Sequence, residues 1–118
     1  MDTRQAILAF SQSEKIKSGL IWISQSLELL QGLPPAERKG AERVLSILLR
    51  FVENELGPAR NIVGGDSWEE IGNHIERAHN MIQSGVGHEA AIHLSRALSK
   101  VTNTSLKAMT ALQERTLL

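Results

Sequence analysis

All four histidines of the chain lie between positions 74 and 93, at His74, His79, His88 and His93. Imidazole nitrogens and carboxylates are ligands that helical proteins use to hold zinc and other divalent cations. Glu70 precedes His74 by one helical turn, and His88 could approach the same end of the fold as His79. The sequence therefore offers one candidate site for Zn²⁺ or another divalent metal, made of Glu70, His74, His79 and His88, and no other cofactor is expected.

The spacing of Glu76 and His79 resembles the E-x-x-H motif of the ferritin-like di-iron bundles. That family carries the motif twice, with a further inward-facing Glu on each of the other two helices. The second copy is missing here, because Glu89 and His93 are four residues apart. Helical periodicity also places His79 beside the expected core stripe but directs Glu76 away from that core. The two side chains cannot both enter the bundle, so an internal di-metal centre is not expected.

A phosphate-relay function is a second possibility for His79. The segment from Ala78 to Gln83 is similar to the A-H-x-x-K-G pattern of histidine phosphotransfer domains, which are helical bundles of this size. Ile82 and Gln83 stand where that family has the Lys and Gly that assist the phosphoryl group and admit the partner. The similarity is therefore one of fold class, and no phosphorelay activity is expected.

Composition excludes several classes of protein. The 118 residues include no Cys, which rules out disulfide scaffolds, thiolate zinc sites and thiol nucleophiles. No G-x-S-x-G segment is present to position a nucleophilic serine. Apolar runs stay well short of the roughly 20 residues that a membrane span requires. A non-enzymatic protein of the cytoplasm, without a membrane partner, is the expectation.

Each of two expected helices carries basic residues on one of its sides. They are Lys39, Arg43 and Arg50 on the second helix, and Arg96, Lys100 and Lys107 on the fourth. Thirteen Lys and Arg are balanced by thirteen Asp and Glu, and this zero net charge removes the long-range positive field that attracts nucleic acid. Aromatic side chains for base stacking are also few, with two Trp, two Phe and no Tyr. We therefore expect solvated basic faces and no nucleic-acid partner.

Apolar residues at steps of three and four predict helices at about 3–31, 35–56, 67–84 and 88–114. Gly and Pro punctuate the chain between these helices: the breaks are a short turn at 32–34, a loop from Gly57 to Gly65, and a second turn at 84–87. Asp66 and Glu69 have the spacing of a capping box for the third helix. Residues 1–118 are thus expected to form one all-α domain, an antiparallel up-down-up-down four-helix bundle.

The core stripe of the first helix is expected to be Ile16, Leu20, Ile23, Leu27 and Leu30. For the second helix, the pattern favours Ala41, Leu45, Leu48 and Val52, widened by Val44 and Phe51. Trp68, Ile71, Ile75, Ala78 and Ile82 form the corresponding stripe of the third helix.

More apolar residues are present than these stripes can bury, and they are Leu8, Ile21, Trp22, Leu29 and Ile47. A monomeric bundle would carry polar residues at such positions, and a contiguous apolar patch usually marks an interface. The sequence therefore predicts a helical protein interaction module that self-associates through its first helix, with a homodimer as the first expectation. The alternative is a metal-binding or small-ligand-binding bundle that uses the histidine-rich hairpin.

Overall fold

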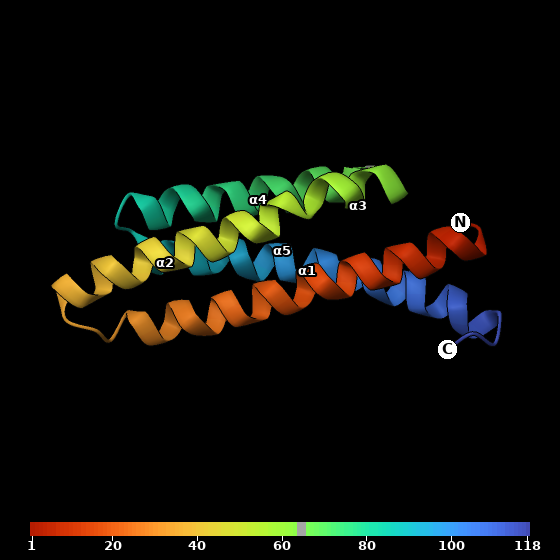
Figure 1. The fold of residues 1–118 in the computed structure, drawn as a ribbon, viewed down its shortest axis with the longest axis horizontal. Helices are drawn as coiled ribbons and strands as arrows, with labels where there is room; N and C mark the ends of the chain where they lie inside the picture. Colours follow the sequence, from red (N-terminus) through yellow and green to blue (C-terminus); the bar gives the residue numbers. More distant parts are fainter. Residues whose placement is uncertain (64–65) are drawn as a thin grey trace.

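The structure is a computed structural model and describes residues 1–63 and 66–118. These residues form five α-helices and no strand. The helices are α1 (Thr3–Leu30), α2 (Pro35–Asn54), α3 (Leu56–Val63), α4 (Asp66–Gln83) and α5 (Gly87–Glu114). Only Glu55 separates α2 from α3, and the two run on in the same direction as one leg (Figure 1).

Four helical legs pack against each other in antiparallel order, which confirms the predicted four-helix bundle (Figure 1). The α2–α3 leg and α5 each pack against both α1 and α4. The molecule measures 52 × 22 × 19 Å, and both termini lie at the same end. There the Nη2 atom of Arg115 donates a hydrogen bond to the carbonyl oxygen of Met1 at 2.8 Å.

Local sequence signals explain where the helices begin and end. Asp2 and Gln5 form a capping box at the start of α1, with reciprocal hydrogen bonds of 2.7 and 2.9 Å. At the end of α4, Gly85 adopts a positive φ of 79°. The amide of Val86 then reaches back to the carbonyl of Met81 at 2.9 Å, which closes a Schellman turn into α5. The capping box predicted at Asp66 involves a side chain outside the described residues.

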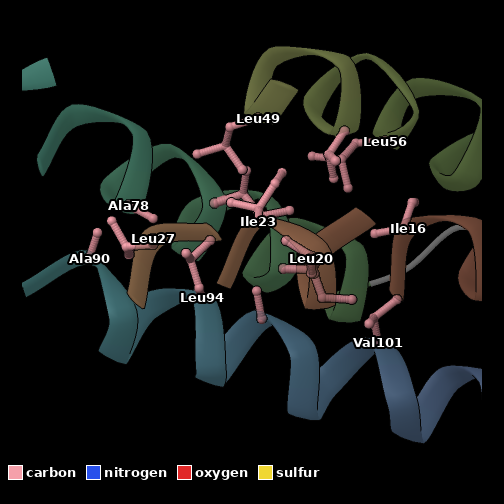
Figure 2. Close-up of a cluster of buried hydrophobic side chains, with 14 of the residues drawn as sticks. Ile16, Leu20, Ile23, Leu27, Leu49, Leu56, Ala78, Ala90, Leu94 and Val101 are labelled. Atoms are coloured by element: carbon pink, nitrogen blue, oxygen red, sulfur yellow. The ribbon is translucent and has the colours of Figure 1, made fainter. Parts of the chain in front are cut away.

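The core follows the predicted stripe of α1, since Ile16, Leu20, Ile23, Leu27 and Leu30 are all buried. Figure 2 shows core side chains of α1 between the α2–α3 leg and α5. The predicted stripe of α4 is buried as well, from Trp68 to Ile82. Each fully buried Leu or Ile stabilises the fold by about 1.5–3 kcal/mol relative to an exposed one.

The core prediction for the second helix is confirmed at Leu45 and Val52 but is wrong at Val44, Leu48 and Phe51. The structure buries Leu45, Leu49 and Val52 on α2, and leaves Val44 and Phe51 each 59% exposed and Leu48 41% exposed. Both stripes share Leu45 and Val52 and continue at helical spacing to the buried Leu56 and Ala59. The burial of Leu49 instead of Leu48 therefore follows from how α2 packs against α1 and α4, and not from spacing within the helix.

The loop predicted from Gly57 to Gly65 is also wrong over most of its length, because residues 57–63 belong to α3. Pro58 lies in the first turn of α3, where a missing amide hydrogen leaves no helical hydrogen bond unmade. Leu56 and Ala59 are buried and hold this short helix on the core. Gly64 and Gly65 lie outside the described residues.

None of the helices described combines the length and the apolar character that a bilayer crossing requires.

Candidate interaction surface

The predicted metal ligands lie against separate partners. The contacts are Glu70 with Lys100, His74 with His93, His79 with Glu53, and His88 with Glu89. Over residues 1–63 and 66–118, no group of three or more His, Asp or Glu side chains is placed to hold a metal ion. The structure therefore does not bring Glu70, His74, His79 and His88 together.

His74 of α4 and His93 of α5 form a stacked pair across the hairpin. Their Nδ1 atoms are 3.3 Å apart and their ring centroids 5.6 Å apart. Partial burial lowers the pKa of His74, and the positive charges of His93, Arg77, Arg96 and Lys100 add to this effect. The stacked pair joins α4 to α5.

His79 faces the other way, toward α2. Its Nδ1 atom is 2.5 Å from Oε1 of Glu53, and the residue is only 7% exposed. The carboxylate accepts this hydrogen bond, which ties α4 to α2. Nε2 of His79 is buried and has no partner in the described part of the chain. Glu76 is exposed on the surface of α4 and takes no part in this contact.

Two polar contacts fix α1 against its neighbours. Glu14 accepts hydrogen bonds from Lys17 and Ser105, each at 2.6 Å, and both lower the pKa of its carboxyl group. Gln12 donates to the side chain of Glu55 at 2.7 Å and to its carbonyl oxygen at 2.9 Å, and the first of these bonds lowers the pKa of Glu55. The first contact joins α1 to α5 and the second joins it to the α2–α3 leg.

The predicted interface residues of α1 do not all lie on one side of the helix. Trp22 and Leu29 are 69% and 78% exposed, and Leu8 is also exposed. Ile21 is half-buried, and its helical position turns it away from Trp22. Ile47 of α2 is exposed but lines a groove against α4 instead of facing α1.

The side chains that flank Trp22 come from α2, and the sequence stripe had assigned them to the core. Helical spacing places Val44, Leu48 and Phe51 on the side of α2 nearest α1, which is also the side of Glu55. A Cβ atom at Gly19 would lie 2.8 Å from Val52, so these two residues are level. Three or four residues further along the antiparallel pair, Trp22 is level with Leu48.

We call these five exposed side chains, three from α2 and two from α1, the outer apolar face. They are Trp22, Leu29, Val44, Leu48 and Phe51. The sequence contained a signal for this face, because Leu48 and Leu49 are both apolar and lie on different sides of the second helix. If one of them is buried in the core, the other must be exposed.

A groove of about 670 Å³ lies on the opposite side of α2, against the C-terminal end of α4. We call it the basic groove, since four cationic side chains of α2 line it: Arg38, Lys39, Arg43 and Arg50. A second hollow of about 410 Å³ continues it past Arg50 and Gln83 toward Arg60 and His79. Lys39, Arg43 and Arg50, which were expected to form a solvated face, therefore line a depression together with Arg38.

Comparison with known proteins finds no relative: no family model, no curated protein and no solved structure matches this chain.

Proposed function

We propose that this protein is a non-enzymatic helical interaction module that self-associates through the outer apolar face. The observation that carries the proposal is the exposure of Trp22 and Phe51, which helical spacing from the close approach of Gly19 to Val52 places at similar levels of the adjacent helices α1 and α2. Exposed single apolar residues are common on protein surfaces, but a contiguous group with two large aromatic rings is typical of interfaces.

The size of the face supports a stable contact. At their exposed fractions, the five side chains present on the order of 600 Å² of surface per copy, close to the ~800 Å² per partner of a standard interface. Neighbouring rim residues on both helices would supply the remainder. Trp and other aromatic residues at the centre of such a patch contribute most of the binding energy.

A second copy of the chain is the partner that we propose. A two-fold dimer places the same patch on both sides of the interface, so an apolar face meets an apolar face without any further partner. The polar contacts of Gln12 and Glu14 hold α1 in place, so that the face is formed before the copies meet, which lowers the entropic cost of association.

Light scattering on a size-exclusion column tests this function. The wild-type chain is expected to elute with the mass of two copies of the 13.0 kDa chain. Trp22→Glu is expected to give a monomer with unchanged helical circular dichroism, because it places a charge in the centre of the apolar contact.

Ile92→Glu provides the matched control, since Ile92 is 57% exposed on α5, which lies diagonally across the bundle from α2. That variant should remain a dimer. A monomeric wild-type chain, or a Trp22→Glu variant that stays dimeric, would contradict the proposal.

A further inference from the structure

The basic groove carries positive charge that the described part of the chain does not neutralise. Arg38, Lys39, Arg43 and Arg50 line one groove, and none of them forms an ion pair within residues 1–63 and 66–118. By contrast, Lys15, Lys17, Arg60 and Lys100 each lie against a glutamate. The charge is therefore concentrated on one side of α2 in a protein whose net charge is zero.

The acidic residue that lines this groove is engaged elsewhere. Glu42 directs its carboxylate toward the start of α5, where Oε2 would lie 3.8 Å from a Cβ atom built on Gly87. Amide groups in the first turn of a helix attract negative charge, so the carboxylate of Glu42 interacts favourably with the N-terminus of α5. In the described part of the chain, Glu42 forms no ion pair with any of the four cations along the groove.

The lining also contains apolar surface. Ile82 of α4 and Ile47 of α2 both line the groove, and the side chain of Ile47 is 53% exposed. From Arg38 to Arg50, α2 extends for about 18 Å, the length of roughly three helical turns. A ligand that matches this surface needs apolar groups on one side and several negative charges beside them.

We infer that the basic groove binds an acidic, amphipathic helical segment of a partner protein. Apolar side chains of that segment would cover Ile47, while its carboxylates would pair with Arg38, Lys39, Arg43 and Arg50. This mode of recognition lays a helix into a groove between two others and uses residues one turn apart as anchors. The groove lies on the α4 side of α2, so it remains free when the outer apolar face is occupied.

Nucleic acid fits the same charges less well. A phosphate backbone would make no apolar contact with the side chain of Ile47, and no aromatic side chain lines the groove for base stacking. A protein segment is therefore the better match.

Fluorescence anisotropy tests the inference with a labelled peptide of about 14 residues, enough for roughly four helical turns, that contains only Glu and Leu in a helical pattern. The wild-type chain is expected to bind it. Reversing two charges with Arg43→Glu and Arg50→Glu together is expected to weaken binding about tenfold or more. Arg96→Glu with Lys107→Glu makes the same change in charge on exposed positions of α5 and should leave affinity within about twofold.

A peptide of the same composition in scrambled order and a short DNA duplex complete the experiment. Equal binding of the scrambled peptide, tighter binding of the duplex, or an equal loss in the α5 variant would each overturn the inference. Repeating the titration with Trp22→Glu separates the two proposals, because a monomeric variant that still binds the patterned peptide establishes the groove independently of self-association.

Discussion

At the scale of single residues, the exposed side chains of α1 and the histidines of α4 and α5 have different surroundings. Trp22 and Leu29 are exposed, as their positions off the α1 stripe required. The histidines cluster in sequence but diverge in space, because His74 faces α5 whereas His79 faces α2. Five residues correspond to about 500° of helical rotation, which turns His79 some 140° away from His74. That rotation was available from the sequence, but the contacts with His93 and Glu53 required the packing of three helices.

The environment of His74 predicts a dependence of stability on pH. Its pKa in the folded chain lies below the ordinary 6.5 because of burial and neighbouring positive charges. As pH falls through that ordinary value, the unfolded chain takes up the proton before the folded chain does, so the free energy of unfolding decreases. Well above 6.5 both states are neutral and the effect is absent.

Urea unfolding at about pH 7.5 and about pH 5.5 measures this effect. The wild-type chain should lose more stability between the two than His74→Gln, whose side chain takes up no proton. Glu14 and Glu55 have lowered pKa values and lose their contribution only at more acidic pH, so they do not obscure the comparison. An equal or larger loss in the variant would contradict this assignment.

At the scale of helices, the number, direction and approximate ends of the legs followed from periodicity and from Gly and Pro. The helices expected at 3–31, 67–84 and 88–114 agree with α1, α4 and α5 to within one residue at each end. The core side of the second helix could not be predicted from spacing alone, because both Leu48 and Leu49 lie one helical turn after Leu45. Packing against the other helices buries Leu49 instead of Leu48, and the buried Leu56 and Ala59 belong to α3, where the sequence had predicted a loop.

Two alanine substitutions distinguish the competing stripes of α2. Leu49→Ala is expected to lower the free energy of unfolding by about 2–5 kcal/mol, because Leu49 is 0% exposed and its removal leaves a cavity. Leu48→Ala, which shortens an exposed side chain, should cost about 1 kcal/mol or less. Both are best measured in the Trp22→Glu background, so that loss of the dimer contact does not contribute. Equal costs would mean that the stripe through Leu49 is not the core stripe.

At the scale of the whole molecule, the bundle has two unlike sides about α2: an apolar one toward α1 and a basic one toward α4. Sequence analysis predicted self-association from Trp22 and Leu29, and that function stays a proposal. It did not predict the partners of these residues on α2, because Val44, Leu48 and Phe51 were assigned to the core. It also placed Ile47 in the interface, whereas the structure places it in the basic groove.

The most direct measurement of the central claim is the fluorescence of Trp22 in a Trp68→Phe variant. Trp68 is buried, and its Nε1 atom has no partner among the described residues, so Phe removes a donor without leaving a polar atom unpaired. Trp22 then becomes the sole fluorophore. If two copies meet on the outer apolar face, its emission should shift to longer wavelength and its quenching by acrylamide should increase as the protein is diluted into the monomer. Emission and quenching typical of an exposed indole at every concentration, in a sample that light scattering shows to be dimeric, would place the interface elsewhere.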